Sequence, residues 1–408
     1  MKIQSHNDTR IVTFGDVDER SYSQLLTCVD AGRAPYAVLC ADHHPGYSQP
    51  IGAAIAYLDQ ISPSGVGYDI GCGNKAVKTN LTVSDIAADL ENLVDEMYSR
   101  ISFGIGRINN EPVDHPVLDL IAHSPFVPQR KLLQLAKDQL GTVGSGNHYV
   151  DIFFDSQMNI WIGVHFGSRG FGHKTASGFL SLSQGGKFDE RGKEGEMDSA
   201  PVLFDVDSSI GQDYIEAMRV AGAYAFAGRD IVVDRVLDIL GATAVKTVHN
   251  HHNYAWPETH EGQDLWVVRK GCTPAFPDQE SFIGANMRDS AYIVSGRNNT
   301  QARMALNSTV HGAGRVMSRR QAAGKTKWKD GKRVTVKPGL VDYAEVYREL
   351  TEEQYIIIRG GGPDEAPQVY KNLNQVIAEH ADTILHEYQL DVLAVMMAGD
   401  NEFDPYKD

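Results

Sequence analysis

The sequence predicts a single α+β domain in which mixed central β-sheets, flanked by helices, surround a dinuclear metal site. Two observations predict this class. Short apolar runs with the length of strands alternate with glycine-rich turns and with longer segments of helical spacing throughout the 408 residues. Candidate site residues also occur from Asp69 to His311, so a domain boundary between them would divide one site. We therefore expect one domain over residues 1–408, with a basic segment at 315–337 and a tail at 399–408.

The composition is ordinary for a soluble globular protein and excludes several classes. Hydrophobic residues make up 42% of the chain and charged residues 22%. We find no run of eighteen apolar residues and no signal peptide at the polar amino terminus, so we expect no membrane association. Four cysteines without paired spacing predict free thiols and a cytoplasmic location. The net charge of −15 argues against nonspecific nucleic-acid binding by the protein as a whole.

Apolar runs of five to seven residues predict the strands. They lie, in chain order, at 36–40, 53–58, 160–166, 265–269 and 291–296. A loop is predicted at 41–52, directly after the strand at 36–40. Asp42, His43 and His44 lie near its start, and polar site residues commonly occupy this position after a buried strand. A further strand should begin after the GSGNH segment, which places His148 at its mouth and Asp151 further along it.

Three segments have the spacing of helices, at 84–98, 131–140 and 208–240. Ser84 is a suitable N-cap for the first of them. The third contains the small residues AGAYAFAG, so we expect it to pack tightly against a neighbour. The GSRG segment follows the strand that ends near His165, and its backbone amides and the Arg169 guanidinium could bind a phosphate.

The stretch 65–75, GVGYDIGCGNK, carries a carboxylate and a thiol, Asp69 and Cys72, on one glycine-rich turn. Glycine lets the backbone bend sharply there and approach a bound group closely. His148, His165 and His252 lie in similar segments rich in glycine or asparagine. One such histidine alone is more often a hydrogen-bonded structural residue, but the shared context favours a common site.

Together these five residues predict a metal site. Five ligands exceed the number that one tetrahedral ion takes, whereas two ions that share Cys72 would use all of them and keep open positions for a substrate. By ligand softness alone, zinc is the first choice. His249 and His251 are interpreted instead as surface histidines near a turn.

Eight segments of the chain, in the same order, resemble those of the RtcB-type RNA ligases, also called tRNA-splicing ligases. They are ADHHPGYSQPIG, VGYDIGCGN, GSGNHYVDI, HFGSRGFG, HHNY, RKG, HGAGRVMSR and DEAPQVYKNLNQVI. The resemblance runs from about residue 36 to residue 395 and implies an RtcB-like domain.

The resemblance also implies roles for particular residues. Cys72 would bridge two Mn²⁺ ions; His148 and His165 would complete one ion, and Asp69 and His252 the other. His311 would be the nucleophile that takes GMP from GTP. The residues implied to hold the nucleotide are Asn147, His148, Tyr149, Asp151, His252, Asn253, Gly284, Ala285, Asn286, Met287, Gly312, Ala313, Gly314 and Tyr370, the last against the guanine.

The activity implied is the Mn²⁺- and GTP-dependent joining of RNA with a 2′,3′-cyclic phosphate or 3′-phosphate end to RNA with a 5′-hydroxyl end, in tRNA splicing or RNA repair. The chain departs from the family pattern in the nucleotide pocket. Asp151 replaces the usual glutamate, Gly284-Ala285-Asn286-Met287 replaces Pro-Gly-Ser/Thr-Met, and Ala291 aligns with a family serine. The chain ends in MMAGDNEFDPYKD, without the family's terminal lysine-glycine pair.

These departures leave three functions open: a ligase with altered nucleotide preference, a metal-dependent RNA phosphoesterase that no longer charges His311, and a noncatalytic RNA-binding protein. The segment from Arg315 to Lys337 has nine basic residues against one acidic residue, Asp330. It is either a solvated face or part of an RNA path. The sequence names neither the RNA substrate nor an activating protein.

Overall fold

The computed structural model describes residues 1–190, 192, 196–329 and 332–400. Within these residues, a six-stranded sheet has the strand order β1-β2-β3-β4-β12-β11. Its strands are β1 (Lys2–His6), β2 (Thr9–Thr13), β3 (Tyr36–His44), β4 (Ile51–Tyr57), β12 (Gln263–Lys270) and β11 (Asn253–His260). Neighbouring strands are antiparallel except β2 and β3, which are parallel.

A second sheet, eight-stranded in the described part, has the order β10-β6-β8-β7-β20-β15-β14, with β19 paired to β20. Its strands are β10 (Ala244–His251), β6 (Gly73–Thr82), β8 (Asn159–Phe166), β7 (Tyr149–Phe154), β20 (Ile384–Gly399), β15 (Ala291–Gly296), β14 (Glu280–Ile283) and β19 (Ile357–Gly361). Three further strand pairs are β5 (Gln60–Ile61) with β9 (Phe204–Asp205), β13 (Cys272–Pro274) with β16 (Ser308–Val310), and β17 (Gly324–Lys329) with β18 (Lys332–Pro338).

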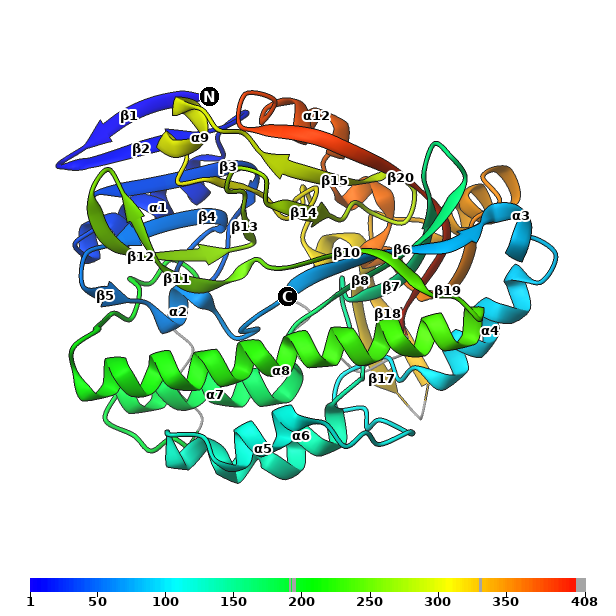
Figure 1. The fold of residues 1–408 in the computed structure, drawn as a ribbon, viewed down its shortest axis with the longest axis horizontal. Coiled ribbons are helices and arrows are strands. Elements are labelled where there is room, and N and C mark those ends of the chain that lie inside the picture. The colour runs from blue at the N-terminus through cyan, green and yellow to red at the C-terminus, as the bar shows by residue number, and fades with distance from the viewer. Residues whose placement is uncertain (191, 193–195, 330–331, 401–408) are drawn as a thin grey trace.

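Helices cover the sheets, and the longest of them, α8 (Ser209–Leu240), runs along one side of the molecule beneath both (Figure 1). The other α-helices are α1 (Glu19–Ala31), α2 (Pro63–Val66), α3 (Val83–Ile86), α4 (Leu90–Arg100), α5 (Pro116–Ala122), α6 (Leu133–Gln139), α7 (Arg169–Ser183), α9 (Thr300–Met304), α10 (Arg319–Ala323), α11 (Tyr343–Arg348) and α12 (Leu373–Ala378). Short turns of other helix types are η1 (Val127–Leu132), η2 (Glu349–Glu353), η3 (Pro363–Glu365) and η4 (Pro367–Val369).

The central strands of the first sheet are apolar on both faces because both faces are covered. Leu39 and Ile55 pack into a core shared with α1, α7 and α8. Val38 and Ala54 face the opposite way and pack against a second core around β16 and α12. Successive side chains of a strand point to opposite faces, so two covered faces give a continuous apolar run. This is why 36–40 and 53–58 could be identified from the sequence.

The structure confirms the α+β class and most of the predicted elements. The five predicted strands lie in β3, β4, β8, β12 and β15, and the helix predicted at 208–240 is α8. The loop predicted at 41–52 is shorter, because β3 continues to His44 and β4 begins at Ile51. In the described part of the chain, no helix combines the length and the apolar character that crossing a bilayer requires.

The prediction of a single helix at 84–98 is wrong. Thr82, not Ser84, forms a capping box with Asp85 at the start of α3, and a second helix, α4, begins after Asp89. The apolar pattern did not reveal the break because Ile86, Leu90 and Val94 keep a spacing of four residues across it.

Candidate active site

Four adjacent strands of the second sheet end at one place, and four predicted ligands lie at these ends. Gly73, the first residue of β6, pairs with His251 at the end of β10 and with Phe166 at the end of β8. Tyr149, the first residue of β7, pairs with His165. The ligands at these four ends are Cys72, His148, His165 and His252. The antiparallel order of the strands therefore gathers side chains that are far apart in the sequence.

The turn that carries Asp69 and Cys72 is closed by backbone hydrogen bonds. The Cys72 amide donates to the Asp69 carbonyl at 3.0 Å, and the His252 amide donates to the Cys72 carbonyl at 2.8 Å. Gly71 has a φ of +72°, and a Cβ added there would lie 3.2 Å from both Ala225 Cβ and Gly222 Cα of α8. The small residues of α8 thus pack tightly against this turn, as the sequence predicted.

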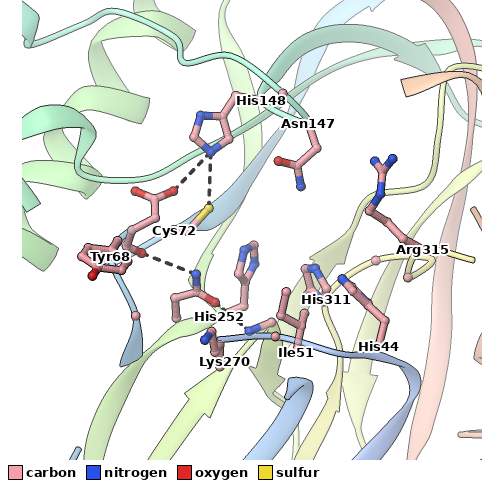
Figure 2. Close-up of a pocket in the computed structure, with 18 of the residues that line it drawn as sticks. His44, Ile51, Tyr68, Cys72, Asn147, His148, His252, Lys270, His311 and Arg315 are labelled. Carbon is pink, nitrogen blue, oxygen red and sulfur yellow. Dashed lines mark hydrogen bonds and ion pairs between the residues drawn. The ribbon is translucent and has the colours of Figure 1, made fainter. Parts of the chain in front are cut away.

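Cys72 contacts two of the predicted histidine ligands. Its Sγ atom lies 3.8 Å from His148 Nε2, a contact drawn as a dashed line in Figure 2, and 3.7 Å from His165 Nε2. The three donor atoms lie within 4.8 Å of one another. Asp69 Oδ2 lies 3.2 Å from His148 Nε2, and the His252 ring lies 5.0 Å from the His165 ring between centroids. The structure therefore brings three donors into one cluster, with Asp69 in contact with it and His252 beside it.

The hydrogen bonds around this cluster fit a bound cation. His165 Nδ1 donates to Asn74 Oδ1 at 2.5 Å, which leaves the Nε2 lone pair available to a cation near Cys72. The buried Nδ1 atom of His252 has no hydrogen-bond partner among the described residues. Buried polar atoms are rarely left without a partner, so a ligand is the simplest explanation. A thiol, imidazoles and a carboxylate suit a borderline divalent ion, but its identity and the number of ions stay predictions.

The protonation states of these donors also suit a cation. Burial lowers the pKa values of His165 and His252 well below the usual value, so both rings are neutral at neutral pH. Burial, with the nearby Asp69 charge, raises the pKa of the Cys72 thiol well above its usual value. Burial alone would raise the pKa of Asp69, but the hydrogen bond and charge of His148 outweigh it and lower this pKa to about 2.

These shifts predict that metal binding releases a proton from Cys72. His165, His252 and the Asp69 carboxylate need no deprotonation, whereas the thiol is protonated until a cation displaces its proton. We expect about one proton released per chain on titration with Mn²⁺, and an affinity that rises roughly tenfold per pH unit below the thiol pKa. Calorimetry in buffers of different ionisation enthalpy measures both quantities. An affinity that is constant between about pH 6.5 and 8 would contradict a thiolate ligand.

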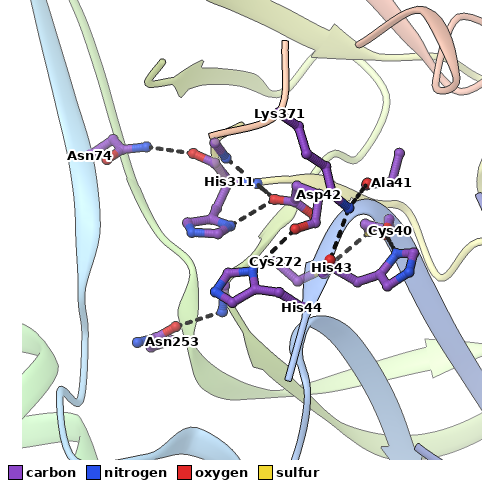
Figure 3. Close-up of polar contacts among 12 residues, drawn as sticks. Cys40, Ala41, Asp42, His43, His44, Asn74, Asn253, Cys272, His311 and Lys371 are labelled. Atoms are coloured by element: carbon purple, nitrogen blue, oxygen red, sulfur yellow. Dashed lines mark hydrogen bonds and ion pairs between the residues drawn. The ribbon is translucent and has the colours of Figure 1, made fainter. Parts of the chain in front are cut away.

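His311 is held by a buried carboxylate on a distant strand (Figure 3). Its Nδ1 donates to Asp42 Oδ2 at 2.8 Å, and its backbone amide donates to the same oxygen at 3.0 Å. Burial would raise the pKa of Asp42, but the hydrogen bond and charge of His311 outweigh burial and lower it, so Asp42 accepts as a carboxylate. Because Nδ1 carries the proton, Nε2 has the free lone pair.

Several residues that support the site had no role in the sequence prediction. Asn74 links the metal cluster to the histidine loop, because its Nδ2 lies 3.3 Å from the His311 carbonyl while its Oδ1 accepts from His165. Lys371 donates to the carbonyls of Ala41 and His43, on either side of Asp42. Asn74 belongs to a quoted motif, and so does Lys371, but only the folded chain shows their partners.

All the predicted site residues line one cavity of about 1520 Å³. The part implied to hold the base includes Tyr149, Asp151, Met287 and Tyr370. Asp151 is 5% exposed, and its Oδ1 has no hydrogen-bond partner in the described part of the chain. Burial raises the pKa of Asp151 well above the usual value, which favours the protonated acid. The protonated acid can donate one hydrogen bond and accept another, unlike a carboxylate, which only accepts.

Two side chains that were expected to bind ligands, Asn253 and Arg169, form hydrogen bonds with the protein backbone in this structure. Asn253 Oδ1 accepts from the Gly271 amide at 2.6 Å. The Arg169 guanidinium lines the cavity and donates to the Gly104 carbonyl at 2.9 Å. A phosphate contact of Arg169 and a nucleotide contact of Asn253 stay predictions.

The basic segment is not uniform. Arg315 donates to the Tyr370 hydroxyl at 3.2 Å, and Arg319 pairs with Asp364 at 3.0 Å and with Glu365. These two arginines line the cavity, whereas Arg320, Lys325 and Lys337 are exposed. The side chains at 326–335, including Lys327, Lys329, Asp330, Lys332 and Arg333, lie outside the described residues, as does most of the predicted tail, 401–408. The RNA path along this segment stays a prediction.

The interpretation of His249 and His251 as surface histidines near a turn is wrong. Both lie in β10, and α8 covers them. The ring of Phe226 on α8 lies 4.1 Å from the His249 ring and 4.0 Å from the His251 ring between centroids. Both side chains also contact Arg229.

Comparisons with known proteins match most of the chain. The family model described as tRNA-splicing ligase RtcB matches residues 28–123 and 121–398. The RNA-splicing ligase RtcB of Escherichia coli (strain K12) is 30% identical over 378 residues, which cover 86% of this chain and 86% of that protein. The tRNA-splicing ligases RtcB of Nanoarchaeum equitans and Thermococcus kodakarensis are 28% and 27% identical, and each comparison covers 84% of this chain and 83% of the relative.

Proposed function

Because the chain belongs to the RtcB family of tRNA-splicing ligases, we propose that it joins RNA ending in a 2′,3′-cyclic phosphate or 3′-phosphate to RNA beginning with a 5′-hydroxyl. The proposed cofactors are two Mn²⁺ ions and GTP. The observation that carries this proposal is the position of His311. Asp42 holds one of its ring nitrogens, and its ring lies 4.8 Å from the His252 ring, in the cavity that the predicted ligands also line.

In the proposed reaction His311 is the nucleophile. The Nε2 lone pair attacks the α-phosphorus of GTP, an N–P bond forms, and the bond to the leaving pyrophosphate breaks. An oxygen of the RNA 3′-phosphate then takes the GMP group from His311. The 5′-hydroxyl of the second RNA attacks the activated 3′-phosphate, GMP leaves, and the strand is joined. A terminal cyclic phosphate is first hydrolysed to the 3′-phosphate.

The proposed metal ligands are Cys72, shared by both ions, with His148 and His165 for one ion and Asp69 and His252 for the other. Bound ions would supply positive charge against phosphate oxygens. Burial keeps His165 and His252 neutral, so that their ring nitrogens can bind a cation, and the hydrogen bond to Asn74 orients the His165 ring. Gly312 lines the cavity beside His311, whereas Gly314 packs against the Asp42 backbone, where an added Cβ would clash with the Asp42 carbonyl oxygen.

The cavity suits an anionic polymer better than the chain as a whole does, because its lining carries no excess of acidic residues. The whole chain has 38 basic and 53 acidic residues. The residues lining the cavity include seven basic and six acidic ones. They are Arg20, Arg169, Lys174, Lys270, Arg315, Arg319 and Lys371 against Asp16, Asp18, Asp69, Asp151, Glu196 and Glu365. The cavity lining is thus close to neutral in formal charge in a chain with a net charge of −15, so it should repel RNA phosphates less than the average surface of the chain.

One observation favours a second candidate, an RNA phosphoesterase that no longer takes up a nucleotide. Burial raises the pKa of Asp151 and so favours its protonated form, which offers one acceptor fewer to the N1 and N2 donors of guanine than a carboxylate does. Gly284 also lies so close to Tyr149 that an added Cβ would be 2.3 Å from its hydroxyl oxygen, so the pocket is narrow there. Both features predict weaker selection of guanine, and complete loss of nucleotide use would leave only the metal-dependent hydrolysis.

One assay separates these functions. The protein is incubated with Mn²⁺, α-labelled GTP, an RNA with a 3′-phosphate and an RNA with a 5′-hydroxyl. A ligase gives labelled protein with Mn²⁺ and GTP alone, and a joined product only when both RNA ends are present. A phosphoesterase releases phosphate or opens a cyclic phosphate without labelled protein. A noncatalytic RNA-binding protein shifts the RNA and changes neither end.

Replacing Asp42 with asparagine should slow the transfer of GMP to His311. An asparagine amide can present an N–H to Nδ1, which moves the ring proton to Nε2 and removes the lone pair that attacks. We expect the rate of adduct formation to fall by on the order of 10²- to 10⁴-fold, the effect of comparable orienting carboxylates. Mass spectrometry over a time course measures this rate.

The matched control is Asp155→Asn, which alters another buried aspartate that bonds Trp161 outside the cavity. This variant should lose stability but form the adduct at the wild-type rate. Equal rates for Asp42→Asn and wild type, at equal GTP occupancy, would show that Asp42 does not orient His311.

A further inference from the structure

The buried side chain of Arg229, on α8, contacts three backbone segments that carry predicted metal ligands. Its Nη1 donates to the carbonyl oxygens of Gly71 at 2.9 Å and Phe166 at 2.6 Å. Its Nε donates to His249 Nε2 at 2.8 Å, and its Nη2 lies 3.0 Å from His251 Nδ1. The residues next in sequence to Gly71, Phe166 and His251 are the ligands Cys72, His165 and His252.

Packing alone does not explain an arginine at this position. Arg229 is 0% exposed, and no acidic side chain of the described residues pairs with it, since the adjacent Asp230 pairs with Lys75 and His249. Burying a charge without an acidic partner is unfavourable, and an apolar side chain of similar length would avoid that cost. A guanidinium, however, presents five donors in one rigid plane and can hold several acceptors at once.

The surroundings fix the guanidinium in its place. The Phe226 ring lies 5.2 Å from the central carbon of the Arg229 guanidinium and also contacts both histidines of β10. Burial lowers the pKa of Arg229 to about 10, so the side chain still carries its charge at neutral pH. The guanidinium therefore acts as a fixed connection between the Cys72 turn, the end of β8 and the end of β10.

We propose that Arg229 is a positioning residue of the candidate metal site, which holds the segments carrying Cys72, His165 and His252 in their converged arrangement before a cation binds. Without this connection, cation binding would have to order the three segments, and the cost would appear as weaker binding. The inference rests on the metal site of the proposed function, but it does not depend on the RNA chemistry.

The test measures Mn²⁺ binding to the full chain by calorimetry, without RNA or GTP. Arg229→Met keeps the length of the side chain and removes every donor, so we expect Mn²⁺ affinity to fall by on the order of 10- to 100-fold. Arg229→Lys keeps the charge but reaches fewer of the acceptors, so its affinity should be intermediate. Substitution with Co²⁺ adds a spectroscopic measurement, because the near-ultraviolet absorption of a cobalt–thiolate bond should weaken in the same order.

The matched control is Arg235→Met on the same helix. Arg235 is 7% exposed, and it bonds Asn109 and the Glu111 carbonyl, away from the metal cluster. This variant should lose stability but keep Mn²⁺ affinity within about twofold, because distant sites act independently. Wild-type affinity in Arg229→Met, or an equal loss in Arg235→Met, would overturn the inference.

The remaining outcomes are also decisive. If Arg229→Met does not fold, Arg229→Lys decides, and an unchanged affinity with an unchanged cobalt spectrum overturns the inference. A wild-type protein that binds Mn²⁺ but joins no RNA contradicts the proposed function alone. A wild-type protein that binds no Mn²⁺ contradicts both.

Discussion

Cys72→Ala should remove both of the proposed metal ions and abolish the proposed RNA joining. The Cys72 sulfur lies 3.8 Å from His148 Nε2 and 3.7 Å from His165 Nε2, so it is the atom that the other donors surround. A bridging thiolate serves both ions, whereas each histidine serves one. We therefore expect Cys72→Ala to lose more metal than any single histidine variant, and to reduce joining by at least about 10³-fold. Elemental analysis after dialysis measures the metal content.

Cys28→Ala is the matched control, because Cys28 is also a buried free cysteine but contacts the Ser48 carbonyl rather than the cluster. It should keep the wild-type metal content. Thermal unfolding in the presence of a chelator should show that Cys72→Ala is folded, so that the loss of metal reflects the missing sulfur. Two ions per chain in Cys72→Ala would refute the bridging role.

The ligand set could be predicted because its sequence contexts are unusual. Cys72 lies on a turn with glycines that the structure requires, since Gly71 has a positive φ and touches α8. His148 and His165 lie at strand ends, where periodicity changes to glycine-rich loops. The structure places these side chains in one cavity, while their roles toward metal and nucleotide stay predictions. The prediction of one undivided domain is likewise untested.

The contacts that support the site could not be predicted, for a physical reason. Asp42 and His311 are separated by 269 positions, and only the pairing of distant strands brings them together. Arg229 lies in a helix whose pattern resembles that of any core helix, and its partners are mostly backbone carbonyls and histidines of β10. Backbone acceptors leave no mark on the sequence. The prediction of His249 and His251 as surface residues is wrong for a similar reason, since the side chains that cover them, Phe226 and Arg229, come from α8.

His311→Asn should abolish the covalent nucleotide adduct and with it the joining of RNA. Only a ring nitrogen with a free lone pair can form the phosphoramidate, and the hydrogen bond from Nδ1 to Asp42 leaves that lone pair on Nε2. Asparagine keeps a polar side chain near Asp42 but has no such nitrogen. Wild-type protein incubated with Mn²⁺ and GTP should gain the mass of one GMP, in a bond that acid breaks and base does not, and His311→Asn should gain none.

The matched control for His311→Asn is His123→Asn, which changes an exposed histidine and should gain GMP like the wild type. The same mass measurement with ATP in place of GTP tests the base pocket. The raised pKa of Asp151 favours its protonated form, which has one acceptor fewer for guanine, and a lost contact of this kind costs on the order of 1–3 kcal/mol. We therefore expect some adduct with ATP as well as with GTP. No adduct with either nucleotide, in wild-type protein shown to hold its metals, would exclude the ligase and leave the phosphoesterase. An adduct that persists in His311→Asn would place the nucleophile on another residue of the cavity.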